Sequence, residues 1–338
     1  MSHPIADTLG NAIGAMRADK DMKQVLDKLG QLTDKHIEDL DVAAARQQPT
    51  PADAVKALLT EQGKSTDPTS LVPGITTQDI AIPRPAGSLS ARVFTPAGAG
   101  PFPLIVYFHG GGWVIADKTV YDGGARGLSK EANAVVVSVD YRQSPEHKFP
   151  AAWDDALAAY RWVAEQATQL NGDPRRIALA GESAGGNLAL ATAIAARDAN
   201  VAQQPCHVLA VYPVTQTSVN TESYIANAIA KPLNRAMIEW FVDKLINSKD
   251  DLKDTRLQLI DANLTGLPSV TIVNADIDPL RNDGSKMEDA LRKARVPVER
   301  KNYDGVTHEF FGMAAVIEKA REAQAWAGER LLEAFASA

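Results

Sequence analysis

The most informative part of the chain is residues 176–190, which read RIALAGESAGGNLAL. Its apolar start, Arg176 to Ala180, predicts a strand, and its Ala/Leu-rich end begins a predicted helix over Asn187 to Arg197. Between them, Gly181 to Gly185 form a Gly-x-Ser-x-Gly pattern, which is typical of a nucleophile elbow. Glycine at both ends lets the backbone turn sharply, so that the hydroxyl of Ser183 projects from the sheet beside a helix N-terminus. Ser183 is therefore the candidate nucleophile.

A run of glycines lies upstream of this serine. The motif His109-Gly110-Gly111-Gly112-Trp113 directly follows an apolar run, residues 104–108, that predicts a strand. A glycine run alone is most often a flexible turn, but here it precedes a serine elbow, and the two motifs are expected together. Backbone amides of glycine can approach a substrate oxygen closely, which favours an oxyanion-binding loop.

The rest of the chain supports a layered α/β arrangement. From Pro103 onward, short apolar runs alternate with helical segments, as expected for parallel strands that helices cover on both faces. The runs are Leu104 to Phe108, Ala134 to Val139, Ile177 to Ala180, Val208 to Tyr212 and Val270 to Val273. Alternation between Thr76 and Thr95 predicts two antiparallel strands. Ligands in such folds bind at the carboxyl ends of the strands.

Helical periodicity divides the chain further. Residues 1–72 combine helical spacing with many charges and contain no strand-like run, which predicts a helical region attached to a catalytic domain at residues 73–338. Residues 227–249 also carry apolar residues at helical spacing. They form either a cap element over the site or a helix that packs its apolar face on the sheet.

The general base is found by elimination. In hydrolases with this elbow, the order along the chain is serine, acid, histidine. Of the six histidines, four precede Ser183, and His207 begins the strand predicted at 208–212. Only His308 follows the acidic candidates, in a loop beyond an extended run. His308 is therefore the candidate base.

The acid should follow a strand that lies between the serine and the histidine. Asp276, Asp278 and Asp283 all follow the last predicted strand of that interval. Pro279 fixes the backbone directly after Asp278 and would hold its carboxylate still, which favours Asp278. The pattern alone leaves Asp276 open.

Together these motifs resemble the hormone-sensitive-lipase branch of the α/β-hydrolases, a family of bacterial carboxylesterases and related lipases. The resemblance spans about residues 76–330. In chain order it rests on HGGGW at 109–113, VDYR at 139–142, PEH at 145–147, FPAA at 149–152, GESAGGN at 181–187, DPL at 278–280, and Gly305 with His308 and Phe310.

The resemblance implies an α/β-hydrolase fold, with a mostly parallel central sheet flanked by helices and an N-terminal helical cap at residues 1–72. It implies that Asp278 is the acid of the catalytic triad. It assigns the oxyanion hole to the backbone N–H groups of Gly111, Gly112 and Ala184. Many members have Asp or Thr at the position of Glu182, so we expect the contacts of Glu182 to differ while the chemistry survives.

The implied function is that of a serine carboxylesterase that hydrolyses small, short-chain esters through an acyl-enzyme. Trp113 either lines the substrate pocket or supports its packing. The resemblance also implies that the polar residues of the Asp-Tyr-Arg and Pro-Glu-His segments are mostly structural, namely Asp140, Arg142, Glu146 and His147. An amidase or deacetylase would use the same triad, so that alternative stays open. A relative that only binds small molecules would have lost a triad member, and none is missing here.

Composition limits the partners. The 338 residues carry a net charge of −7, which argues against nucleic acid and anionic membranes, because both demand a basic face. No metal or cofactor motif occurs, so none is expected. Cys206 is the single cysteine, which rules out an intrachain disulfide. The chain has no secretory signal and no run of ~18 apolar residues, which predicts a cytoplasmic protein without membrane insertion. Family analogy suggests a homodimer.

Overall fold

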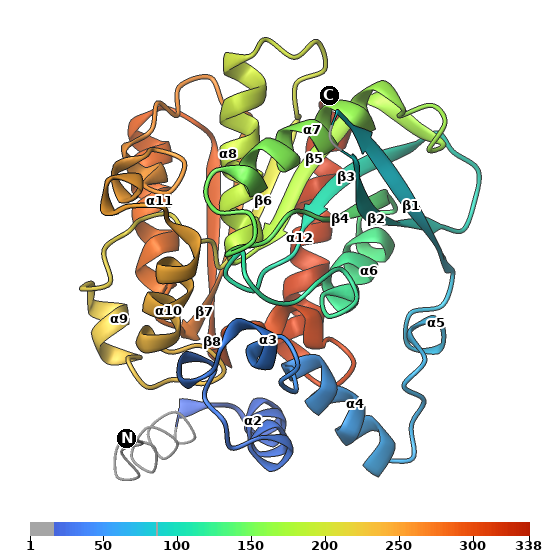
Figure 1. The fold of residues 1–338 in the computed structure, drawn as a ribbon. Coiled ribbons are helices and arrows are strands. Elements are labelled where there is room, and N and C mark those ends of the chain that lie inside the picture. The colour runs from blue at the N-terminus through green and yellow to red at the C-terminus, as the bar shows by residue number, and fades with distance from the viewer. Residues whose placement is uncertain (1–16, 86) are drawn as a thin grey trace.

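The structure, a computed structural model, describes residues 17–85 and 87–338. Its core is an eight-stranded sheet in the order β1-β2-β4-β3-β5-β6-β7-β8 (Figure 1). The strands are β1 Ile75–Arg84, β2 Gly87–Pro96, β3 Phe102–Phe108, β4 Val135–Asp140, β5 Gly172–Glu182, β6 His207–Val211, β7 Ser269–Ile277 and β8 Val298–Thr307. Strand β2 runs antiparallel to β1 and β4, and all other neighbours pair in parallel. The predicted mostly parallel sheet and the two antiparallel strands near its edge are confirmed.

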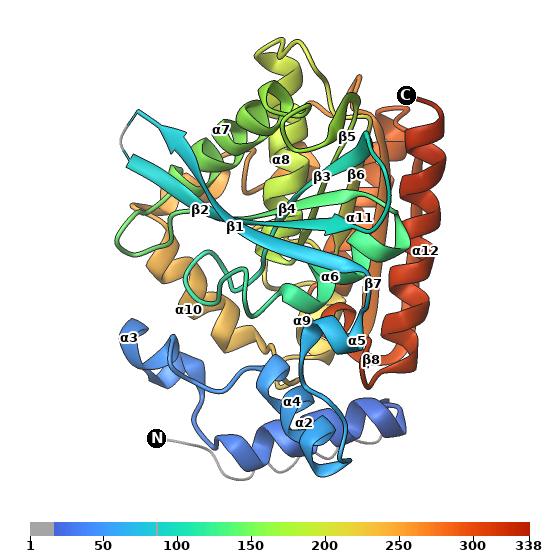
Figure 2. The same cartoon turned by 90° about the vertical axis from the view of Figure 1, so that its right-hand side faces the viewer.

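Helices cover both faces of the sheet (Figure 2). One face carries α7 (Ala151–Glu165), α8 (Ala184–Asp198) and α11 (Arg281–Lys293), and the other carries α6 (Asp122–Glu131) and α12 (Glu318–Ala336). In β3, Leu104 and Val106 pack in the first layer, whereas Ile105 and Tyr107 pack in the second. Successive side chains of a strand point to opposite faces, and here both faces are buried. This explains why β3 reads as an uninterrupted apolar run.

The described part of the N-terminal region is helical and lies at one end of the sheet (Figures 1 and 2). It contains α2 (Lys20–Leu32), η1 (Ile37–Asp39), α3 (Val42–Ala45), α4 (Pro51–Glu61) and α5 (Pro68–Leu71). A capping box between Thr50 and Asp53, with Pro51 in the first turn, determines where α4 begins. Met22 of α2 and Leu59 of α4 are buried in the same apolar cluster. Residues 1–16 of the predicted helical region lie outside the described residues.

Within residues 227–249 the helix is α10 (Arg235–Leu245), and the short α9 (Glu222–Ala226) precedes it. The side chains of Ile238, Trp240 and Phe241 are buried in one cluster with Ala45 of α3 and with Val114. Val114 belongs to the loop that follows β3, residues 109–114, which we call the glycine loop. Most of the apolar face of α10 therefore packs against these two segments. The helix joins the N-terminal helices to the loop that follows β3.

Short 3-10 helices connect the remaining elements, namely η2 (Lys249–Lys253), η3 (Leu259–Asp261) and η4 (Phe310–Met313). Within residues 17–85 and 87–338, no helix combines the length and the apolar character that crossing a membrane requires.

Candidate active site

Ser183 lies at the junction of β5 and α8, where the chain turns from strand into helix. Its backbone has φ 58° and ψ −116°, a conformation that residues other than glycine rarely adopt. The N–H of Ser183 donates to the carbonyl oxygen of Val211 at 2.8 Å, which helps to hold this turn. A Cβ at Gly185 would overlap the carbonyl oxygen of Phe108, and one at Gly181 would overlap that of Gly185. The tight turn therefore requires both glycines of the motif.

His308 follows β8 and reaches both of its predicted partners. Its Nε2 lies 3.0 Å from Oγ of Ser183, and its Nδ1 lies 2.7 Å from Oδ2 of Asp278. All three side chains are buried, Asp278 completely. The N–H of Leu280 donates to Oδ1 of Asp278 at 2.8 Å and orients the carboxylate. Burial opposes a charge on His308, but the adjacent Asp278 carboxylate outweighs burial, and the pKa of the imidazole is raised.

The other two acidic candidates have different surroundings. Asp276 forms ion pairs with Arg17 at 2.8 Å and Arg281 at 2.9 Å. Asp283 is buried and accepts hydrogen bonds from two residues of the loop after β6, at 3.0 and 2.9 Å. Burial raises the pKa of Asp283 to about 7. Of the three acids, the structure brings only Asp278 into hydrogen-bond contact with the histidine.

The glycine loop lines the same cavity as Ser183. Gly111 and Gly112 have φ values of 92° and 58°, which glycine adopts readily. Ala184 is the first residue of α8, which starts earlier than the predicted Asn187. Among the described residues, none accepts a hydrogen bond from the backbone N–H of Gly111, Gly112 or Ala184. These donors are free to bind a substrate oxygen.

Hydrogen bonds from distant segments hold the glycine loop in place. The hydroxyl of Tyr141 donates to the carbonyl oxygen of His109 at 2.8 Å. Arg46, which follows α3, donates through Nε to the carbonyl oxygen of Val114 at 2.8 Å and pairs through its terminal nitrogens with Glu146 at 2.7 and 2.8 Å. The hydrogen bonds from Arg46 lower the pKa of Glu146 to about 2. The N-terminal helices are thus tied directly to the glycine loop.

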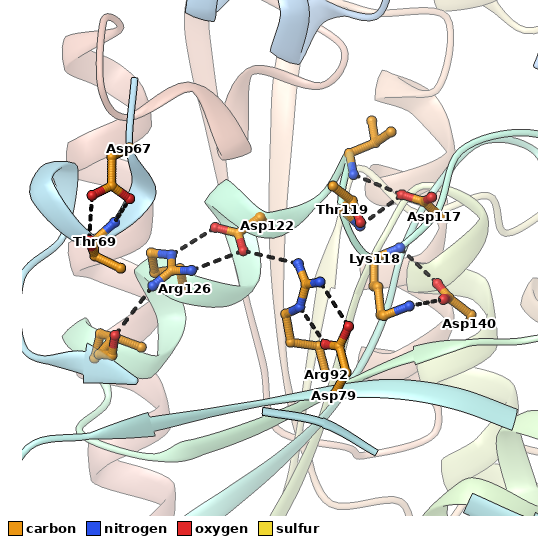
Figure 3. Close-up of polar contacts among 12 residues, drawn as sticks. Asp67, Thr69, Asp79, Arg92, Asp117, Lys118, Thr119, Asp122, Arg126 and Asp140 are labelled. Atoms are coloured by element: carbon orange, nitrogen blue, oxygen red, sulfur yellow. Dashed lines mark hydrogen bonds and ion pairs between the residues drawn. The ribbon is translucent and has the colours of Figure 1, made fainter. Parts of the chain in front are cut away.

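A network of ion pairs holds the segment between the glycine loop and α6 (Figure 3). Asp140 accepts hydrogen bonds from the N–H of Lys118 at 2.8 Å and from its ammonium group at 2.5 Å. Asp122, the first residue of α6, pairs with Arg126 at 2.7 Å. Asp140 therefore has a structural role, because it binds Lys118. Together with the pair of Asp122 and Arg126, it holds both ends of the short segment that contains Tyr121.

Two adjoining cavities meet at Ser183. The larger, of about 420 Å³, is bounded by the glycine loop, the N-terminal helices and the segment leading into α10. The smaller, of about 50 Å³, has a mostly apolar lining and borders Gly112. Phe241 of α10 lines both cavities. Trp113 lines the smaller one and stacks on Trp153 with ring centroids 5.3 Å apart, so it both lines a pocket and supports its packing.

Two carboxyl groups are chain neighbours of the serine and the histidine. Glu182 is only 1% exposed and accepts hydrogen bonds from the hydroxyls of Tyr107 and Tyr212. Burial raises the pKa of Glu182 to about 7. Glu309 accepts a hydrogen bond from Tyr121 at 3.0 Å, and burial raises the pKa of Glu309 as well. Sequence patterns assigned no role to Glu309 or to these tyrosines, because no motif links residues so far apart in the chain.

Within the described residues, no group of three or more His, Cys, Asp or Glu side chains is arranged to hold a metal ion. The hydroxyl of Ser183, the imidazole of His308, the carboxylate of Asp278 and the unpaired N–H groups form an arrangement that is chemically able to carry out acyl transfer.

Several known proteins with similar sequences and structures are esterases. Residues 105–312 match a family described by the alpha/beta hydrolase fold. Carboxylesterase NlhH of Mycobacterium tuberculosis is 42% identical over 225 residues, which cover 65% of this chain and 70% of NlhH. Esterase LipI of the same organism is 39% identical over 260 residues, 74% of this chain and 80% of LipI. The crystal structure of a thermostable esterase from Pseudomonas putida ECU1011 superposes with a TM-score of 0.83 at 30% identity, covering 94% of this chain and 98% of that one.

Proposed function

Because this chain belongs to the hormone-sensitive-lipase-like carboxylesterase family of the α/β-hydrolase fold, we propose that it hydrolyses carboxylic esters with Ser183 as the nucleophile. The observation that carries the proposal is the hydrogen-bonded series from Asp278 through His308 to Ser183, with distances of 2.7 and 3.0 Å. A nucleophile, a base and an orienting acid in this order form the arrangement that activates a serine hydroxyl.

The proposed reaction has two steps. Nε2 of His308 accepts the proton of Ser183 while Oγ attacks the ester carbonyl, and the resulting imidazolium then protonates the departing alcohol. Water, deprotonated by His308, attacks the acyl-enzyme, and the serine leaves with its proton restored. Asp278 holds the imidazole in the tautomer that presents Nε2 to the serine.

We assign the oxyanion hole to the N–H groups of Gly111, Gly112 and Ala184. The two glycines line the cavity at Ser183, and Ala184 begins the helix directly after it. Donors that are already oriented stabilise the negative oxygen of the tetrahedral intermediate without reorganisation.

The ester class is tested by comparing aryl acetate, butyrate, octanoate and decanoate esters with the isosteric anilides of the same acids. We expect turnover of the short esters to exceed that of the matched anilides by several orders of magnitude. Preferential cleavage of the anilides would favour an amidase instead, and inertness toward both series would contradict a hydrolase.

The smaller cavity supports a preference for short acyl chains. Its volume of about 50 Å³ leaves room for only a few carbon atoms, and Phe241 lines both this cavity and the larger one. We expect Phe241→Ala to raise kcat/KM for octanoate relative to acetate by about tenfold, because each additional buried methylene contributes about 0.8 kcal/mol. The ratio of the two kcat/KM values measures this effect.

Phe149→Ala is the matched control, because Phe149 is equally buried but lines neither cavity. The control should leave the ratio of octanoate to acetate unchanged, even where it lowers the melting temperature. An unchanged ratio in Phe241→Ala would assign the acyl group to the larger cavity.

We further propose that the N-terminal helices form a cap that closes the larger cavity. Arg46 connects them to the glycine loop through the carbonyl of Val114 and the carboxylate of Glu146. Arg46→Ala is expected to raise KM by about tenfold with a smaller effect on kcat, because it removes charge-assisted hydrogen bonds far from the reacting atoms. Glu146→Ala should have a weaker effect, since its pair with Arg46 is half exposed and the bond to Val114 remains. Steady-state kinetics on one short ester distinguishes these outcomes, and unchanged KM in Arg46→Ala would argue against the cap.

A further inference from the structure

The mechanism above leaves two acids unused, the buried Glu182 and the partly buried Glu309. Glu182 immediately precedes Ser183, and Glu309 immediately follows His308. Because the serine and the histidine are held together, their neighbours are also brought close. Each of the two acids raises the pKa of His308, and Glu309 also raises the pKa of Glu182 through repulsion.

Glu182 is held by two tyrosines from separate strands. Tyr107 lies on β3 and Tyr212 directly follows β6, and their hydroxyls donate to the two carboxylate oxygens. The ring of Tyr212 is also 4.5 Å from the ring of His308, measured between centroids. The carboxylate of Glu182 is thus one aromatic side chain away from the imidazole.

Glu309 is placed by its unusual backbone conformation. It has φ 67° and ψ 5°, in the left-handed region, and the hydroxyl of Tyr121 donates to its Oε1 at 3.0 Å. Glu309 lines the larger cavity together with Ser183 and His308. It also lines a separate cavity of about 210 Å³ between α4 and α6, which Glu182 lines as well. The two acids therefore line the separate cavity together, and Glu309 also lines the larger cavity beside His308.

Neither acid has a cationic partner among residues 17–85 and 87–338, where no Lys or Arg forms an ion pair with Glu182 or Glu309. A buried carboxylate normally requires such a partner, because removing it from water is costly. The tyrosines donate hydrogen bonds but supply no positive charge. The positive charge that arises next to these acids is the imidazolium of His308 itself, formed during acyl transfer.

We propose that Glu182 and Glu309 are positioning residues that stabilise the imidazolium of His308 during acyl transfer, in addition to Asp278. The inference rests on the proposed serine mechanism. The acids do not contact the reacting atoms. They act through their electrostatic field at the imidazole and through Tyr121 and Tyr212, whose hydroxyls they hold by hydrogen bonds.

Other groups facing this region must be considered for any dependence on pH. From the sheet these are Tyr107, Tyr212 and Asp278, and from the segment before α6 it is Tyr121. From the helical side, the larger cavity is lined by Asp34, Lys35, His36, Glu38 and Arg46. The separate cavity is lined by Lys56, Arg92, Asp122 and Arg126, of which Asp122 pairs with both arginines.

The test is kcat for a short aryl ester as a function of pH in wild type, Glu182→Gln, Glu309→Gln and the double variant. We expect the double variant to lose about tenfold in kcat near about pH 8.5, with KM unchanged. The difference in kcat between wild type and the double variant should become smaller toward about pH 6, for two reasons. The acids of the wild type become protonated there, since the pKa of Glu182 is raised to about 7. In the variant, the loss of negative charge lowers the pKa of His308 and keeps more of it in the basic form.

A merely structural role predicts something different, namely a loss of activity by the same factor at every pH. Glu309→Asp retains the negative charge and should therefore restore most of the pH-dependent part of kcat. Asp276→Asn removes a charge that does not contact the histidine, and it should leave the dependence of kcat on pH unchanged. Melting temperatures show whether each variant is folded. If Glu182→Gln does not fold, Glu309→Gln, whose side chain is only partly buried, decides alone.

A ratio of wild-type to variant kcat that stays constant with pH, or that stays at one, overturns the inference while leaving the proposed mechanism intact. Failure of the mechanism has a separate signature, which is undiminished ester hydrolysis by Ser183→Ala.

Discussion

Replacing Ser183 with alanine is expected to lower kcat for a short aryl ester by about four to six orders of magnitude, because the variant has no oxygen to form the acyl-enzyme. The oxyanion donors and the cavity remain, so a small residual rate above that in water should persist. Alanine keeps the Cβ of serine and tolerates the same φ of 58° equally well. We therefore expect the melting temperature and KM to change little.

The matched control is Ser138→Ala. Ser138 is completely buried on β4, and its hydroxyl has no hydrogen-bond partner among the residues that the structure describes. This substitution removes the same atom elsewhere in the sheet and should leave kcat unchanged. Mass spectrometry of wild type quenched during turnover should detect the added acyl group on the peptide that contains Ser183. Activity of Ser183→Ala close to wild type, or an acyl group on another residue, would rule out the assigned nucleophile.

Asp278→Asn is expected to reduce kcat by about four orders of magnitude. The carboxylate accepts the Nδ1–H of His308 at 2.7 Å, and an amide at this position can present its NH₂ group to Nδ1 and so favour the wrong tautomer. The acid side of the profile of kcat/KM against pH should also move to lower pH. The reason is that Asp278 raises the pKa of His308, and its neutralisation removes that effect.

Asp276→Asn is the control for this substitution, because it changes the same functional group two residues earlier in the chain. Asp276 pairs with Arg17 and Arg281 and makes no contact with the histidine. We expect kcat within about twofold of wild type and a modest loss of stability, since partly exposed ion pairs contribute little. If the large loss were found in Asp276→Asn and not in Asp278→Asn, the acid would have been assigned to the wrong residue.

Much of the fold was predictable because its signals are local. The apolar runs of the parallel strands are consequences of burial on both faces, and each can be recognised within a few residues. The serine elbow is partly local: Gly181 is needed because it approaches the backbone of Gly185 in the same turn, whereas Gly185 is needed because it approaches the carbonyl oxygen of Phe108 on the neighbouring strand β3. The predicted helix after the elbow nevertheless began too late, since Gly185 and Gly186 carry little helix signal and adopt helix because of their packing.

The choice among the three acids shows where local signals end. Asp276, Asp278 and Asp283 follow the same strand within a few residues, and the rigidity of Pro279 favoured one without excluding the first. The structure separates them by direction: one carboxylate meets the histidine, one meets two arginines, and one is buried against the loop after β6. Side-chain direction past the end of a strand depends on what packs around it.

The sequence by itself determined the fold class, the candidate nucleophile and the candidate base. The fold class follows from short-range periodicity, the nucleophile from a strained turn with obligatory glycines, and the base from the order of residues along the chain. Only the tertiary structure decided that Phe241 lines both cavities, how Arg46 ties the N-terminal helices to the glycine loop, and how Glu182 and Glu309 meet their tyrosines. Arg46 and Val114 are 68 positions apart, Glu182 and Tyr107 are 75 apart, and Glu309 and Tyr121 are 188 apart. Their geometry follows from the packing of whole helices and strands, and no short pattern encodes it.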